Sequence, residues 1–445
     1  MTARETAAVD PYDYGQEPRE LIERTDVILR AGQMVLSTGL DSGRCMDFMR
    51  IVAKSLDCDA ITINIAYPQI TATVHRGRIY RTKVSASVTP GVNSDRACEM
   101  WDFMLSMRDH MTPAEITKEL DRIERKPRLY SRHLLAIAAG VACCAYGILN
   151  NMGWYEVIGV FFAVAIAQSL RLFLNYRHVN HLAVVTLAAT VAGSIYLGYL
   201  LVTQDLPGVT HERAMIGFIA AGLFLVPGFP IVSGCLDLGR LDLASGVNRL
   251  TYATLFLLSA GIGMWAVSLF SPVDPTPVPR FDMVDWQILL IKGIASTIGV
   301  MGFAMQFNGP MKVCAAAGGV AFFANIVRLV LAEYVVSHHV AVAVAAFMVG
   351  ILTWLISKYT RWPSVVMAVP ATLVMIPGAA AYRTLLYINA SDVEDMTLFG
   401  LSAVMTVIGL AVGLLAARML TDKRWALSKD VPPSLNEMLK VRNPL

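Results

Sequence analysis

The sequence has few charged residues and lacks the motifs of familiar enzyme active sites. Only 16% of its 445 residues are charged, whereas 55% are hydrophobic and the mean hydropathy is positive. This composition is too apolar for an ordinary soluble protein and is typical of a chain with several membrane spans. The chain has no Walker loop, HExxH motif or nucleophile elbow, which argues against an ATP-driven pump. We therefore expect a membrane protein that is not an enzyme.

Three further features are missing. The net charge is only +3, which argues against nucleic acid as a partner. The seven cysteines show no metal-ligand spacing, so we expect reduced thiols and no metal site. The first long apolar segment begins only near Leu134, which predicts that the chain has no cleavable signal peptide.

The first 132 residues differ in pattern from the rest of the chain. Residues 1–17 carry no hydrophobic periodicity, and we expect them to be disordered. Helical patterns then alternate with three stretches of period two, and Thr112 to Glu115 has the sequence of a capping box. The predicted helices cover residues 18–39, 42–56, 93–107 and 113–123, and the predicted strands cover residues 61–65, 70–74 and 79–84. Residues 18–132 are therefore predicted to form a small α+β domain.

Ten apolar segments follow, and each is about long enough to cross a bilayer, which takes roughly 20 helical residues. They lie near residues 134–149, 155–174, 182–202, 214–232, 250–270, 288–305, 313–331, 335–356, 365–382 and 396–417. Lys and Arg gather in every second connection, which places both termini and the α+β domain in the cytoplasm. We expect a mainly α membrane protein with a 5+5 inverted-topology repeat. Its two five-helix modules cover residues 133–272 and 273–420, and residues 421–445 form a cytoplasmic tail.

Two matching Pro-Gly pairs interrupt the fourth predicted helix of each module. They are Pro227-Gly228 and Pro377-Gly378. Proline removes a backbone donor and clashes with the preceding turn, so both helices should be broken within the membrane. Broken helices in corresponding positions of two repeats indicate a transporter substrate site near the midplane. The alternative is that Pro and Gly are simply common in membrane helices.

A few polar residues are candidates for the transport path. Lys292, Asn325 and Arg328 lie in otherwise apolar helices, where polar groups are either functional or reach toward the interface. Asp237, Asp242 and Arg249 follow the first Pro-Gly pair, either as ordinary loop charges or as an inner vestibule that receives an ammonium group or a proton. No Asp or Glu lies in the middle of a predicted span, so the sequence displays no obvious proton carrier.

The segment from Leu225 to Trp265 resembles the threonine/serine exporter family. The matching positions are Pro227, Gly228, Asp237, Asp242, Ser245, Gly246 and Arg249. The second half is similar to the family's C-terminal membrane module in residues 306–310, 318–319 and 376–378, and the resemblance extends over residues 21–417. We therefore include these seven positions, Pro377 and Gly378 among the expected substrate-path residues.

The resemblance implies a multi-pass carrier of the plasma (inner) membrane that exports threonine and serine. Export would be driven by the proton motive force, with the proton as coupling ion and no other cofactor. Membrane lipid is an expected partner, and a homo-oligomer is compatible with the resemblance. A branch of the family with two separate chains is associated with export of C4-dicarboxylates such as succinate, whereas the fused modules favour amino acids. A third hypothesis is a membrane-anchored hydrolase or sensor that acts through the cytoplasmic domain.

Overall fold

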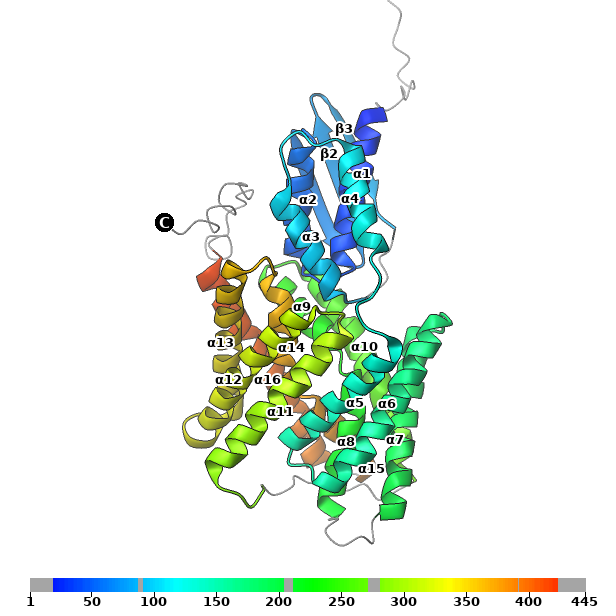
Figure 1. The fold of residues 1–445 in the computed structure, drawn as a ribbon, viewed down its shortest axis with the longest axis vertical. Helices are drawn as coiled ribbons and strands as arrows, with labels where there is room; N and C mark the ends of the chain where they lie inside the picture. Colours follow the sequence, from blue (N-terminus) through cyan, green and yellow to red (C-terminus); the bar gives the residue numbers. More distant parts are fainter. Residues whose placement is uncertain (1–18, 87–90, 204–210, 271–280, 391, 423–445) are drawn as a thin grey trace, which may run out of the picture.

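The computed structural model describes residues 19–86, 91–203, 211–270, 281–390 and 392–422 (Figure 1). The predicted disorder of residues 1–17 lies outside the described residues. Of the predicted tail, residues 421–445, only the first two residues are described. The described chain forms a small α+β unit that sits on one end of a bundle of long helices (Figure 1).

The N-terminal unit contains the three predicted strands and the four predicted helices. Strands β1 (Ala60–Ala66), β2 (Gln69–Arg76) and β3 (Ile79–Val84) form an antiparallel sheet in the order β1-β2-β3. The helices are α1 (Arg19–Leu36), α2 (Ser42–Ser55), α3 (Ser94–Ser106) and α4 (Pro113–Arg125). The alternation of β2 buries Ile70, Ala72 and Val74, while α1 packs against β2 and β3.

The predicted capping box begins α4. Thr112 Oγ1 accepts a hydrogen bond from the Glu115 backbone N–H at 3.2 Å, and Glu115 Oε2 accepts one from the Thr112 N–H at 2.8 Å. These two bonds satisfy donors that a helix start otherwise leaves unpaired. The local sequence pattern is therefore sufficient to fix this helix start.

Eight helices in the described part of the chain are long and apolar enough to cross a membrane. They are α5 (Arg132–Leu149), α6 (Trp154–Tyr176), α7 (His181–Thr203), α10 (Leu243–Ser268), α11 (Asp285–Gln306), α12 (Met311–Tyr334), α13 (His338–Tyr359) and α16 (Val393–Thr421). The fourth and ninth predicted spans are bent pairs instead, and counting each pair once gives ten spans.

Both bent pairs consist of a helix, a 3₁₀ turn and a second helix, in that order. The first contains α8 (His211–Gly222), a 3₁₀ turn (Leu223–Leu225) and α9 (Gly228–Gly239), and it is bent by 61° at the break. The second contains α14 (Ser364–Thr372), a 3₁₀ turn (Leu373–Met375) and α15 (Gly378–Ala390), with a bend of 41°. The breaks predicted at the two Pro-Gly pairs are therefore confirmed.

The helices of the two halves pack in the same order. In the first half α5 packs on α6, α6 on α7, α7 on α10 and α9 on α10. In the second half α11 packs on α12, α12 on α13, α13 on α16 and α15 on α16. Helices α5 and α11 join the halves. The inverted orientation of one half relative to the other stays a prediction.

The N-terminal unit contacts both halves at one end of the bundle, which we call the near end. The backbone N–H of Ser94, at the start of α3, donates to the carbonyl of Phe307 at 2.8 Å, between α11 and α12. Arg361, after α13, pairs with Asp102 of α3 at 2.6 Å. Helices α5, α12 and the first part of α16 therefore extend to the opposite, far end (Figure 1).

The last turn of α16 also lies at the near end. Burial alone would raise the pKa of Asp41, which caps α2, but the guanidinium groups of Arg418, Arg44 and Arg240 lower it below its ordinary value. Arg418 is in the last turn of α16, so the described end of the chain and the N-terminal unit share one side of the bundle. This arrangement agrees with the prediction that both termini face the same compartment.

Candidate functional site

The two Pro-Gly breaks have the same backbone hydrogen bonds. Gly228 N–H donates to the carbonyl of Val226 at 2.9 Å, and Gly378 N–H donates to that of Ile376 at 2.8 Å. Pro227, at the centre of the first turn, has φ −82° and ψ 61°, the geometry of an inverse γ-turn. Proline fits this position because its ring fixes φ near this value and the turn needs no donor from it.

Each break packs against the other. A Cβ atom on Gly378 would lie 2.8 Å from Val226 Cγ2, and one on Gly228 would lie 3.0 Å from Ile376 Cδ1 and would overlap Leu373. The hydroxyl of Tyr382, in α15, donates to the carbonyl of Gly222, at the end of α8, at 2.9 Å. The two interruptions, about 150 residues apart in the sequence, thus form one contact at the centre of the bundle.

A cavity of about 280 Å³ lies beside this contact, near the lower end of the size range of small-molecule sites. Both breaks line it, the first through Leu223 and Val226 and the second through Leu373 to Ala380. Asn150 at the end of α5 and His338 at the start of α13 also line it, so the cavity lies toward the far end. The remaining lining residues are Tyr146, Leu149, Phe303, Arg328, Arg383, Ser402 and Thr406.

The cavity is rich in hydrogen-bond donors and positive charge. Arg328 and Arg383 line it together with His338, and no Asp or Glu is among its lining residues. Within the described chain, Arg383 Nε and the Tyr146 hydroxyl are buried without a hydrogen-bond partner. The first turn of α15, Gly378 to Ala380, also faces this space, and a helix start attracts anions. These groups together are suited to a carboxylate.

Of the three polar residues predicted in the membrane helices, Arg328 lines this cavity and Asn325 supports it. Arg328 Nε donates to Asn325 Oδ1 at 2.7 Å, and the Asn325 side chain is fully buried. Lys292 lies in α11, where it is 8% exposed, and is not one of the lining residues. The structure therefore brings two of the three predicted residues together and leaves Lys292 outside.

The charged residues after the first break lie elsewhere, at the surface where the N-terminal unit docks. Arg249 Nε and Asp237 Oδ2 are 3.0 Å apart, and their side chains are 3% and 0% exposed. Arg249 Nη2 donates to the carbonyl of Leu40 at 2.8 Å, and Asp237 Oδ1 accepts from the Ser42 N–H at 2.9 Å. The guanidinium also stacks 4.2 Å from the centre of the Tyr67 ring. This ion pair therefore joins α9 and α10 to the N-terminal unit.

Ser245, Gly246 and Asp242 belong to the same docking surface or adjoin it. Ser245 Oγ donates to the carbonyl of Ile65, in β1, at 2.8 Å. Gly246 permits the close approach of α9 and α10, because a Cβ there would lie 2.6 Å from Leu238 Cδ2. Asp242 is the residue before α10, and its side chain makes no capping hydrogen bond. These residues thus surround the near end of α9.

Sequence reasoning missed Arg383, Tyr146 and Asn150. The ninth predicted span ends at residue 382, just before Arg383, whereas Arg383 is the sixth residue of α15 and lines the cavity. A search for basic residues one to two turns after each Pro-Gly pair would have found it. Tyr146 and Asn150 offer no such signal, because the packing of α5 on α8, on the turn Leu223–Leu225 and on α11 brings them to the breaks.

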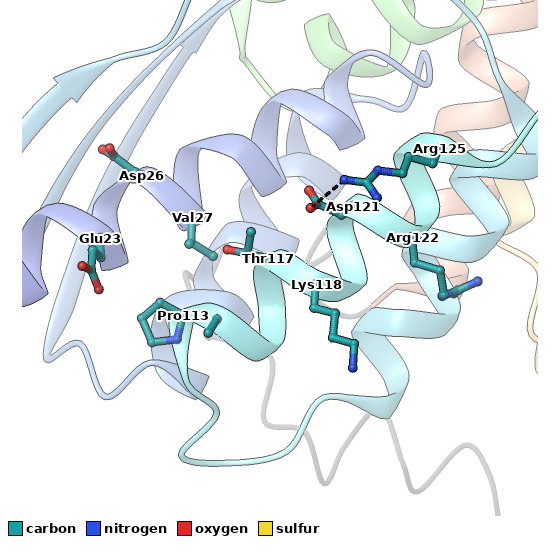
Figure 2. Close-up of a pocket in the computed structure, with 10 residues that line it drawn as sticks. Glu23, Asp26, Val27, Pro113, Thr117, Lys118, Asp121, Arg122 and Arg125 are labelled. Carbon is teal, nitrogen blue, oxygen red and sulfur yellow. Dashed lines mark ion pairs between the residues drawn. The ribbon is translucent and has the colours of Figure 1, made fainter.

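The N-terminal unit has a second hollow, an open groove of about 730 Å³ between α1 and α4 (Figure 2). Its lining mixes acidic and basic side chains, and Asp121 and Arg125 pair across 3.6 Å (Figure 2). The lining residues include Thr117 and Lys118 but no His, Cys or Ser. In the part of the chain that the structure describes, no group of three His, Cys, Asp or Glu could hold a metal ion.

Comparison with known proteins identifies the family. A family model described as "Putative threonine/serine exporter", ThrE, matches residues 26–270, and a second model, "Threonine/Serine exporter, ThrE", matches residues 292–420. The chain is 26% identical over 241 residues to "Probable succinate transporter subunit YjjP" of Escherichia coli K12, covering 54% of this chain and 91% of that protein.

Fungal proteins match over more of the chain. "Pheromone-regulated membrane protein 10" of Debaryomyces hansenii is 22% identical over 446 residues, which cover 90% of this chain and 42% of the fungal protein. A Schizosaccharomyces pombe protein, C7D4.12c, is 21% identical over 436 residues, or 90% of this chain and 56% of that protein. No solved structure matches significantly. With the two family models covering most of its length, the chain belongs to the threonine/serine exporter family.

Proposed function

We propose that this protein is a secondary transporter that exports small carboxylate-bearing metabolites across the plasma membrane, and that C4-dicarboxylates such as succinate fit its cavity best. The observation that carries this proposal is the pair Arg328 and Arg383 in a cavity whose lining includes no Asp or Glu. Two guanidinium groups match the two carboxylates of a dicarboxylate, because each can bind a carboxylate through two nitrogens.

Threonine and serine are the second candidate. The family description names them, and the fusion of both membrane modules in one chain supports them. The ammonium group of an amino acid would then need hydrogen-bond acceptors. Backbone carbonyls of the interrupted segment from Leu373 to Pro377, which lines the cavity, could accept from it. A zwitterion would use one guanidinium group and leave the other without a partner, which is why we rank it second.

The transport cycle that we infer is alternating access, with cytoplasmic termini, ten spans and an inverted repeat of five helices. The matching helix order and the two identical breaks support the repeat. The cavity lies toward the far end, and at the near end the N-terminal unit covers α9 through the Arg249 and Asp237 ion pair. In this cycle the far end faces outward and the N-terminal unit must move for substrate to enter from the cytoplasm.

Efflux measurements test the proposal. Cells with and without the protein are loaded with labelled succinate, or with a threonine dipeptide that releases labelled threonine, and a protonophore is added midway. We expect succinate efflux that depends on the protein and collapses with the protonophore, while excess threonine competes weakly. Threonine efflux that succinate does not inhibit would move the assignment to the amino acids. No effect of the protein on either substrate, with the protein shown in the membrane, would reject the proposal.

A further inference from the structure

A chain of three hydrogen bonds links the backbone of α11 to the guanidinium group of Arg328. The hydroxyl of Ser296 donates to the carbonyl of Lys292, one turn earlier, at 2.7 Å. Asn325 Nδ2 donates to Ser296 Oγ at 2.7 Å, and Arg328 Nε donates to Asn325 Oδ1 at 2.7 Å. Ser296 and Asn325 are both 0% exposed, so water cannot substitute for either partner.

The order of donors in this chain fixes the direction of the Asn325 amide. A serine hydroxyl has one hydrogen, and here the Lys292 carbonyl takes it. The Ser296 oxygen can therefore only accept, and only the NH₂ end of the Asn325 amide can face it. The amide oxygen then has to point toward Arg328. Arg328 Nε can only donate and therefore favours the same orientation, so the hydroxyl and the guanidinium group fix the amide from its two ends.

The direction of the amide in turn orients Arg328. The amide oxygen engages Nε, which leaves the two terminal nitrogens of the guanidinium group for a ligand. Because Arg328 lines the cavity, these nitrogens are the ones that a carboxylate would meet. An amide in the opposite orientation would present its NH₂ group to a cation and push the guanidinium group away from this position.

We propose that Ser296 and Asn325 are positioning residues for substrate binding, which fix Arg328 so that its terminal nitrogens bind one substrate carboxylate. The inference rests on the proposed function, because it assigns Arg328 to the substrate. Neither residue touches the substrate, since neither lines the cavity. Ser296 is the better residue to test, because it does not contact Arg328 itself. It lies two hydrogen bonds from the guanidinium group, so its effect on binding must pass through Asn325.

A matched pair of variants separates the hydroxyl from the volume of the side chain. Ser296→Thr keeps a hydroxyl that can donate to the carbonyl one turn earlier. Ser296→Val places a side chain of nearly the same shape as threonine there, but without the hydroxyl. Uptake of labelled succinate into inside-out vesicles gives KM and maximal rate for each. We expect Ser296→Val to raise KM about fivefold, in keeping with one lost buried hydrogen bond, with a maximal rate within about twofold of the parent. Ser296→Thr should keep KM within about twofold.

Equal KM values for Ser296→Val, Ser296→Thr and the parent protein would overturn the inference. If the added methyl group prevents assembly of both variants, Ser296→Ala adds no atoms and should show the same rise in KM. Equilibrium binding of labelled succinate to the purified full chain gives the same comparison without transport. Failure of the proposed function would appear differently, as absence of succinate binding and uptake in the parent protein itself.

Discussion

At the scale of single residues, Arg383 provides the most direct test of the cavity. Its Nε has no partner within the described chain, and the side chain lies against the ring of Phe399, 5.5 Å from the ring centre. Replacing Arg383 with Gln removes a charged hydrogen bond and should raise the KM for export about tenfold to a hundredfold. The KM of Arg383→Lys should lie between those of the parent protein and Arg383→Gln, because lysine keeps the positive charge but lacks the planar guanidinium group.

The control for Arg383 is another arginine outside the cavity. Arg361 lies at the near end, where its side chain is 52% exposed and pairs with Asp102. Arg361→Gln should leave KM unchanged, because exposed ion pairs contribute little. An unchanged KM in Arg383→Gln, measured in the same vesicle assay, would remove this residue from the substrate site.

The buried ion pair of Asp237 and Arg249 allows a second prediction at this scale. Arg249→Met leaves a buried carboxylate without its partner, and the expected loss of stability is about 3–5 kcal/mol. The double variant Asp237→Leu with Arg249→Met removes both charges and should recover part of that loss. Thermal unfolding of the purified full chain reports the melting midpoints. A double variant that melts below Arg249→Met would show that the hydrogen bonds from Ser42 to Asp237 stabilise the fold by more than the unpaired charge destabilises it.

At the scale of elements, the prediction concerns the contact between the two breaks. Gly378→Ala would place a methyl group 2.8 Å from Val226 Cγ2, and Gly228→Ala would drive one into Leu373. Each variant should therefore separate the broken helices and reduce the rate of export at least tenfold, because close packing leaves no room for an added methyl group. Export from cells, corrected for the amount of protein in the membrane, provides the measurement.

A glycine in the same half serves as the control for this prediction. A Cβ atom on Gly319, in α12, would meet no atom within 4 Å. Gly319→Ala should therefore keep parental export and add helix stability. Loss of export in Gly319→Ala equal to that in Gly378→Ala would mean that added methyl groups harm these helices wherever they lie.

The elements also show which parts of the fold the sequence could predict. The broken helices and the start of α4 follow from local chemistry, since Pro-Gly pairs and a capping box act within a few residues. The docking role of Arg249 could not be predicted in this way, because its partner Leu40 is 209 residues distant. In the sequence Arg249 is either an ordinary loop charge or part of an inner vestibule, whereas in the structure it is buried and donates to the carbonyl of Leu40 in the N-terminal unit.

At the scale of the whole molecule, α9 connects the central break to the N-terminal unit. Phe229, Ser233 and Asp237 are spaced four residues apart, so they share one face of this helix. Phe229 packs on Gly39, Ser233 accepts a hydrogen bond from Arg249 at 3.0 Å, and Asp237 accepts from Ser42. Any movement of α9 that opens the near end must therefore break these contacts or carry the N-terminal unit along.

Tethering the N-terminal unit to the bundle tests this coupling. Asp102 and Arg361 pair at 2.6 Å across the interface, and both side chains are about half exposed, so cysteines there are accessible to a short bifunctional thiol reagent that a reductant can cleave. We expect the tethered double variant to lose most of its export, because alternating access needs the docked unit to move relative to the bundle. Cleavage by the reductant should restore export. Each single cysteine variant, treated with the same reagent, controls for modification alone. Full export from a completely tethered protein would show that substrate reaches the breaks without movement of the N-terminal unit.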